Sequence, residues 1–230
     1  ASILVNYFCA LGVFANTNKA VRRLFLFVAL FTDLGILFLY KYAGFFGHIL
    51  ESLLHTSFDM QYPALPIGIS FYTFQILSYF LDVYNGRAEV QHNPFKLILY
   101  ISFFPQLIAG PIVQYKTVEH QLHERKENWL EASRGMQRFV IGLGKKVLIA
   151  NQVGAVWETI SAMEQPSALT AWLGAIAFTF QIYFDFSGYS DMAIGLGHLF
   201  GFTFLENFRY PYESRTVTEF WRRWHISLGT

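Results

Sequence analysis

Long apolar blocks, each interrupted or ended by a charged residue, a proline or a glycine, recur along the whole chain. They are Ile3–Ala15, Leu24–Leu39, Ala64–Leu81, Leu97–Val113, Phe139–Trp157, Ala168–Phe186 and Met192–Leu205. A helix that crosses a bilayer needs about 20 mostly apolar residues. Several blocks approach this length, and shorter ones are typical of broken or re-entrant segments that protein or a water-filled cavity surrounds. The pattern predicts roughly five to seven membrane elements.

The composition supports this interpretation. Only 14% of the residues are charged, 53% are hydrophobic and phenylalanine alone supplies 25 positions, whereas an average soluble domain carries about 25% charged residues. With 17 basic and 16 acidic residues, the formal net charge is +1, so the chain has no strongly basic face for nucleic acid. We therefore predict an all-α, polytopic integral membrane protein with membrane lipids as its surroundings and no nucleic-acid partner.

Neither end of the chain has the features of a natural terminus. Residues Ala1-Ser2-Ile3 lack an initiator methionine and a basic region, and Leu228-Gly229-Thr230 stops just after the expected start of a helix. We therefore expect residues 1–230 to form a single membrane domain that is a fragment of a longer chain, with the C-terminal part of its fold missing.

Charged residues at membrane depth are costly and usually face a bundle interior, a partner or a cavity. Asp33 interrupts the second block, and Lys145 and Lys146 interrupt the fifth. For the two lysines we favour snorkelling, in which the ammonium reaches the membrane surface. The basic stretches at 19–23 and 116–138 are placed in the cytoplasm, because short basic loops prefer that side.

The sequence predicts no metal site. Cys9 is the single cysteine, and His120 and His123 have no third ligand near them in the sequence. A zinc-binding HExxH helix would need histidine at Glu127.

The richest polar cluster is Gln181–Asp191, which begins inside an apolar block. It contains Asp185, Ser187, Tyr189 and Asp191. Glycine and serine at positions 188 and 190 predict a sharp backbone change followed by a helix cap. Either the cluster is a polar corner whose groups bond one another, or it is a functional site inside the membrane.

The stretch Thr216–Leu228 predicts an amphipathic helix at the membrane boundary, because Thr216 and Glu219 have capping-box spacing. Four-residue spacing then pairs side chains along one face. The pairs are Phe220 with Trp224 and Trp221 with His225. Arg222 and Arg223 fall elsewhere and suit an interface or a negatively charged ligand. On these residues alone, His225 is either a satisfied core residue or a catalyst.

Four stretches together resemble the membrane-bound O-acyltransferase family in its bacterial alginate O-acetyltransferase branch. They are LPIGISFYTFQ at 65–75, FPQLIAGPI at 104–112, DFSGYSD at 185–191 and FWRRWHISL at 220–228. The resemblance runs from about Leu65 to the last residue and rests on the four stretches occurring in this order.

The resemblance implies a ring of membrane helices around a central funnel in the bacterial cell (inner or plasma) membrane. It implies an enzyme that moves an acetyl group from acetyl-CoA or another acyl thioester to a hydroxyl of a polysaccharide in the cell envelope or outside the cell. It implies no bound cofactor. An extracytoplasmic acetyltransferase partner is expected.

The resemblance also assigns roles to residues. His225 matches a histidine implicated in activity, and the family's second, membrane-embedded histidine would lie beyond Thr230, so we expect this piece alone to be inactive. A neutral histidine would take the proton of the attacking sugar hydroxyl. The residues expected to bind substrate or support the site are Gln75, Gln106, Asp185, Ser187, Tyr189, Asp191, Trp221, Arg222 and Trp224. For Asp185 and Asp191 we slightly favour a bracing role.

Three rival interpretations stay open at this point. The nearest is D-alanyl transfer to teichoic acids on the same fold, with a carrier-protein thioester as donor. The others are a polytopic transporter without acyl chemistry and a membrane docking platform for an envelope enzyme.

Overall fold

The computed structural model describes residues 2–55, 63–66, 68–107, 110–111, 113–125 and 128–229, apart from the side chains of Gln106, Leu107 and His123. Within these ranges the chain is helical and forms no strand, so the all-α prediction is confirmed. The chain divides into two compact units. The first unit is Ala1–Ile108 with Gln114–Leu122, and the second is Ala109–Val113 with His123–Thr230.

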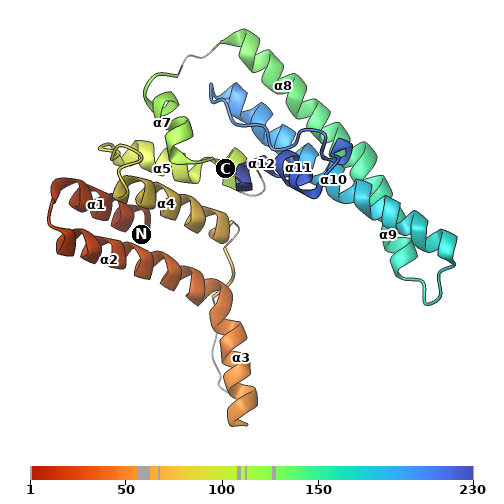
Figure 1. Ribbon diagram of the computed structural model, residues 1–230, viewed down its shortest axis with the longest axis horizontal. Helices are drawn as coiled ribbons and strands as arrows, with labels where there is room; N and C mark the ends of the chain where they lie inside the picture. Colours follow the sequence, from red (N-terminus) through yellow and green to blue (C-terminus); the bar gives the residue numbers. More distant parts are fainter. Residues whose placement is uncertain are drawn as a thin grey trace. The chain divides into compact units, whose positions relative to one another are not determined.

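The first unit is built on helices that pack pairwise, with α2 against both α1 and α4 (Figure 1). Its elements are α1 (Ser2–Ala15), α2 (Lys19–Leu37), the π-helical η1 (Phe38–Tyr42), α3 (Ala43–Leu54), α4 (Ile69–Tyr84), α5 (Pro94–Ser102), α6 (Phe104–Leu107) and α7 (Tyr115–His123). Asparagine starts two of the helices. The Asn18 side chain accepts from the amide of Ala20, and Asn93 accepts from that of Phe95, each at 2.9 Å, which satisfies an amide that the helix leaves unpaired.

Polar residues inside the apolar blocks of this unit find partners. Asp33 is buried, and Asn6 Nδ2 donates to both of its carboxylate oxygens at 2.9 Å. Gln75 is also buried, and its Nε2 donates to the carbonyl of Tyr100 at 3.2 Å. Asp33 therefore faces the interior, as a charge at membrane depth should.

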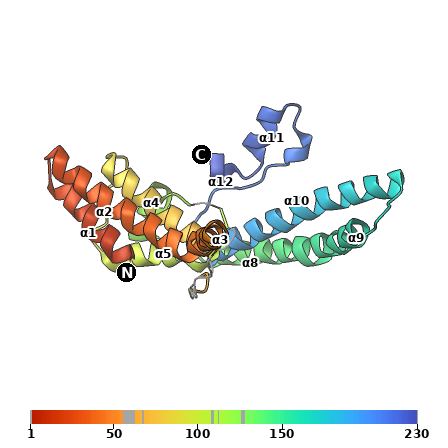
Figure 2. The same ribbon diagram turned by 90° about the horizontal axis from the view of Figure 1, so that it is seen from below.

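The second unit is dominated by two long antiparallel helical rods that lie side by side in both views (Figures 1 and 2). One rod is α8 (Trp129–Gly144), continuing through the π-helical η2 (Lys145–Ala150) into α9 (Asn151–Ser161), and the other is α10 (Ala168–Leu199). The unit ends with the short 3₁₀ helix η3 (Pro211–Glu213), α11 (Val217–Arg223) and α12 (Ile226–Gly229).

Glycines let the two rods approach closely. A Cβ added to Gly142 would lie 2.5 Å from the carbonyl oxygen of Gly188, and one added to Gly135 would lie 2.6 Å from that of Gly195. Only hydrogen fits between the two backbones at these crossings. The prediction of a sharp turn at Gly188 with a cap at Ser190 is therefore wrong. Gly188 serves the close approach, and the sixth apolar block and the seventh as far as Leu199 form the single helix α10.

Among the described residues, three helices are long and apolar enough to cross a membrane. They are Lys19–Leu54, Trp129–Ser161 and Ala168–Leu199, with 36, 33 and 32 residues. At 1.5 Å per residue, each exceeds the roughly 30 Å thickness of a hydrocarbon core. The apolar helix Ser2–Ala15 is shorter.

The C-terminal stretch follows its prediction only at its start. Thr216 Oγ1 accepts from the amide of Glu219 at 3.1 Å, so the predicted cap is present. Phe220 stacks on Trp224 with ring centroids 5.6 Å apart, also as predicted. However, α11 ends at Arg223, so the predicted pairing of Trp221 with His225 along a continuous helix is wrong. The backbone is extended at Trp224 and left-handed at His225.

Candidate functional site

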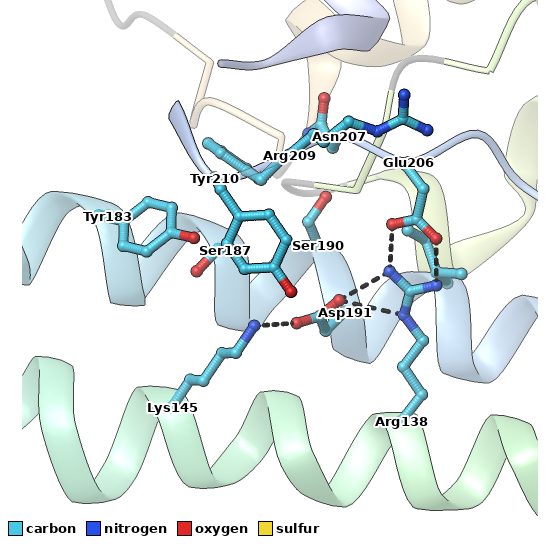
Figure 3. A pocket seen from close by; sticks show the side chains of 12 residues that line it. Arg138, Lys145, Tyr183, Ser187, Ser190, Asp191, Glu206, Asn207, Arg209 and Tyr210 are labelled. Carbon is cyan, nitrogen blue, oxygen red and sulfur yellow. Dashed lines mark hydrogen bonds and ion pairs between the residues drawn. The ribbon is translucent and has the colours of Figure 1, made fainter. Parts of the chain in front are cut away.

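A polar cavity of about 290 Å³ lies in the second unit, between the two rods and the segment that follows α10. Figure 3 shows Arg138 and Lys145 reaching up from the α8 rod toward Asp191 on α10 and Glu206 above it. The lining residues are Arg138, Lys145, Tyr183, Ser187, Ser190, Asp191, Ile194, Glu206, Asn207, Phe208, Arg209 and Tyr210.

An ion-pair network forms one wall of this cavity. Arg138 donates to Asp191 Oδ1 through Nε at 3.0 Å and Nη2 at 2.8 Å. Its Nη1 and Nη2 also donate to the two carboxylate oxygens of Glu206. Lys145 Nζ lies 2.6 Å from Asp191 Oδ2. The network ties both rods to the segment after α10, and each of its charges has an opposite charge beside it.

The predicted snorkelling of Lys145 and Lys146 is therefore wrong. Lys145 is paired with Asp191, and Lys146 Nζ lies 2.5 Å from Asp185 Oδ1. Since both carboxylates are on α10, the two lysines brace the pair of rods. A buried or half-buried charge is retained in an apolar setting when a counter-charge and hydrogen bonds satisfy it.

Three polar atoms in the cavity wall have no hydrogen-bond partner in the part of the chain that the structure describes. They are Ser187 Oγ, Ser190 Oγ and Asn207 Nδ2, and their residues are only 3%, 2% and 1% exposed. An unpaired buried polar group costs free energy comparable to a lost hydrogen bond. Two hydroxyls and an amide N–H beside the cavity therefore lack the bond that a water molecule or a polar ligand would supply.

The predicted cluster on α10 is divided between two faces of the helix. Ser187 and Asp191 line the polar cavity, whereas Asp185 and Tyr189 line a separate cavity of about 270 Å³ together with Ile182 and Phe186. This division follows from the helical continuation through Gly188, because residues four apart in a helix share a face, whereas residues two apart point to different faces.

His225 lies beside α10. Its ring meets that of Phe186 edge to face with centroids 4.7 Å apart. The side chain is half-buried, and this burial lowers the pKa of the imidazole below its usual value. A lowered pKa keeps the ring neutral near pH 7, which is the form that accepts a proton.

The other residues predicted from the last stretch have different surroundings. Trp224 packs in an aromatic cluster with Tyr183 and Phe208. Trp221 is 62% exposed, and Arg222 is also exposed. Neither of these two lines the polar cavity.

The remaining predicted residues, Gln75 and Gln106, belong to the first unit. Gln75 is held by Tyr100, and the side chain of Gln106 lies outside the described residues. Among the residues that the structure describes, no group of three His, Cys, Asp or Glu is placed to hold a metal ion.

Sequence reasoning missed Arg138, Glu206 and Asn207 as members of the site. Arg138 ends a long polar stretch and reads as part of a cytoplasmic loop. The available signal was the pair Glu206-Asn207, two polar residues directly after an apolar block that ends at Leu205.

Long apolar helices around a charged, hydrogen-bonding cavity define a membrane protein with an internal polar site. Comparison with known proteins agrees: residues 10–230 match the family model of MBOAT, the membrane-bound O-acyltransferase family. The chain belongs to this family.

Curated relatives include acetyltransferases and an alanyltransferase. The chain is 46% identical to the probable alginate O-acetylase AlgI of Pseudomonas aeruginosa over 98% of its own length and 44% of the relative. It is 35% identical to the peptidoglycan O-acetyltransferase of Helicobacter pylori over 99% of its length and 49% of the relative. It is 28% identical to the teichoic acid D-alanyltransferase of Bacillus subtilis over 71% of its length and 42% of the relative. The chain thus spans less than half the length of these relatives.

Proposed function

We propose that the protein containing this chain transfers an acetyl group from an acyl thioester to a hydroxyl of a polysaccharide in the cell envelope or outside the cell. Acetyl-CoA is the first candidate for the donor. The observation that carries the proposal is the 46% identity to a probable alginate O-acetylase over 98% of the chain. The more distant peptidoglycan O-acetyltransferase has the same kind of reaction in its name.

In this proposal His225 takes part in the acyl-transfer reaction. A sugar hydroxyl is a poor nucleophile, so a neutral imidazole must take its proton as the oxygen attacks the thioester carbonyl. Burial lowers the pKa of His225 and so favours the neutral ring. His225 either takes the proton itself or orients the second histidine that the family resemblance implies further along the full chain.

The developing oxyanion needs a hydrogen-bond donor. An indole N–H, a backbone N–H or the imidazole of His225 itself can supply this bond. Asp185 and Asp191 brace the rods through their ion pairs with lysines. Ser187, with its unpaired hydroxyl, is the predicted residue that best suits a direct contact with substrate.

We place the protein in the bacterial cytoplasmic membrane as a multi-pass protein. The helix Lys19–Leu54 and the rod Trp129–Ser161 each begin at a basic stretch, and such stretches stay in the cytoplasm. The thioester donor is cytoplasmic, and the polysaccharide acceptor lies on the other side or reaches the funnel from it. An extracytoplasmic acetyltransferase partner completes the transfer.

The test is the O-acetyl ester content of the envelope polysaccharide in cells that carry the full-length protein or its His225→Gln variant. Both proteins are brought to equal membrane levels. His120→Gln is the matched control, because His120 is an exposed histidine on α7. Loss of ester in the His225 variant alone supports the proposal. Full activity in that variant removes His225 from the chemistry.

The identity to a teichoic acid D-alanyltransferase supports D-alanyl transfer as a second candidate function. In that case the ester would carry D-alanine, whose amine distinguishes it from acetate. Release of the ester by mild base and analysis of the acid released therefore separates the two reactions in the same samples.

A further inference from the structure

Asn207 holds the residues directly after His225. The amide of Ile226 donates to the carbonyl oxygen of Asn207 at 3.0 Å. The amide and the hydroxyl of Ser227 both donate to Asn207 Oδ1, at 3.3 and 2.9 Å. Asn207 is 1% exposed and Ser227 is 3% exposed, so water does not compete for these bonds.

The backbone at His225 needs such support. Its φ is +45°, in the left-handed region that side chains with a Cβ rarely adopt. A residue persists in such a conformation only where the surrounding structure fixes it. The bonds from Ile226 and Ser227 to Asn207 fix the chain immediately after the left-handed residue, and they thereby set the direction of the His225 side chain.

Asn207 is itself anchored to the two rods. Its neighbour Glu206 bonds Arg138 on α8 through both carboxylate oxygens, and Arg138 also bonds Asp191 on α10. Since α10 also carries Phe186, against which the His225 ring packs, the backbone and the ring of His225 are both located relative to α10.

We infer that Asn207 is a positioning residue for His225: its side-chain and main-chain oxygens lock the turn that carries the imidazole and connect that turn to the ion-pair network of the rods. The kinetic consequence rests on the proposed function of His225, whereas the structural consequence does not. Asn207 touches no reacting atom in this assignment.

A competing role for Asn207 can be separated from positioning. Its Nδ2 is buried without a partner in the described part of the chain, and Asn207 lines the polar cavity, so donation of this N–H to a ligand is the alternative role. The Asn207→Asp variant keeps an acceptor oxygen for Ser227 and removes the N–H, whereas Asn207→Ala removes both. Positioning predicts that Asp rescues what Ala loses, and ligand donation predicts that it does not.

The first readout is independent of activity. The full-length protein in detergent is treated with diethyl pyrocarbonate, and modification of His225 is measured by mass spectrometry relative to His198 on α10. We expect Asn207→Ala to raise this ratio severalfold and Asn207→Asp to leave it near the parent value. Asn128→Ala is the matched control. Asn128 Oδ1 likewise accepts from a main-chain amide, that of Leu130 at 3.0 Å, but it caps α8 and does not touch the His225 turn.

The second readout is acyl transfer by the same proteins. Displacement of a reacting group by about 1 Å can cost about 100-fold in rate. We therefore expect kcat of Asn207→Ala to fall about 10- to 100-fold, with KM for the donor within about twofold of the parent because ground-state binding is unchanged. Asn207→Asp should recover most of kcat.

The outcomes are distinct. An unchanged modification ratio in Asn207→Ala overturns the inference, and so does an equal loss in the Ala and Asp variants with a raised KM. If Asn207→Ala fails to insert, Ser227→Ala removes one of the two donors to Oδ1 and should raise the ratio to a smaller extent. If the parent shows no acyl transfer, the proposed function fails, and the modification ratio still decides the positioning role.

Discussion

The close crossing of α8 and α10 at glycines predicts that replacing glycine with alanine has opposite effects on the stability of the protein at two nearby positions. A Cβ on Gly142 would lie 2.5 Å from the carbonyl oxygen of Gly188 and 2.8 Å from the amide nitrogen of Met192, whereas ordinary contacts begin near 3.4 Å. A Cβ on Gly144, two residues along the same helix, would meet nothing within 4 Å. We compare Gly142→Ala with Gly144→Ala in the full-length protein.

The magnitude follows from two opposing effects. Alanine is favoured over glycine inside a helix by about 1 kcal/mol, and this gain is common to both positions. At Gly142 the new methyl group meets main-chain atoms, which cannot rotate away, and overpacking of this kind costs about 1–3 kcal/mol. Gly144→Ala should therefore be neutral or stabilising, and Gly142→Ala should be less stable than Gly144→Ala by about 1–3 kcal/mol, since the common gain cancels.

The assay is unfolding of the purified protein by increasing mole fraction of a denaturing detergent. Trp157 on α9 reports locally, because its ring packs 4.8 Å from that of Phe178 on α10. The midpoint and slope of the transition give the free energy of unfolding for each variant. Equal stability of the two variants, or greater stability of Gly142→Ala, would refute the close crossing as the reason for glycine at this position.

Three further predictions concern charge. Arg138→Met should destabilise the full-length protein by about 2 kcal/mol in the same assay, because two carboxylates lose a partly buried partner. Lys146→Met should cost less than about 1 kcal/mol, because that pair is more exposed, and equal losses would contradict this ranking. Since burial lowers the pKa of His225, the unfolded chain binds more protons than the folded one just below the ordinary pKa, so stability falls as pH falls through that range. Phe186→Ala should expose the imidazole of His225 and so raise its pKa. The acid limb of the pH–rate profile should then move to higher pH. An unmoved limb would mean that another group titrates.

Local signals in the sequence predicted where the helices lie better than they predicted which helices contact one another. The second, fifth and sixth apolar blocks marked the three described helices that are long enough to cross a membrane. Thr216 marked the start of α11, because capping depends on neighbours within one turn. Gly188 was misinterpreted as a turn because glycine suits both a turn and a close helix approach. The choice between them is made by Gly142, 46 positions earlier, which no local pattern identifies.

The ion pairs show the same limit in the candidate site. A lysine near the middle of an apolar block snorkels when no acid faces it and forms a pair when one does. Asp191 faces Lys145 only because α8 and α10 are antiparallel and cross at glycine, so the pair depends on the register of two rods. The sequence predicted Asp191 as a site residue. It did not identify the partner Arg138, because that contact depends on the register of the two rods.

His225 differs from both cases, because its neighbours in the sequence argue against its conformation. The run from Thr216 to Leu228 has a capping box and good helix-forming spacing, and yet α11 ends two residues before His225. The bonds to Asn207 and the packing on Phe186 together outweigh continuation of the helix. A helical His225 would share a face with Trp221, whereas the left-handed turn brings the imidazole onto α10. Strain of this kind, at a polar residue that is held from several sides, is typical of functional positions. It is therefore the backbone at this position, more than the identity of the residue, that favours a role for His225 in the chemistry.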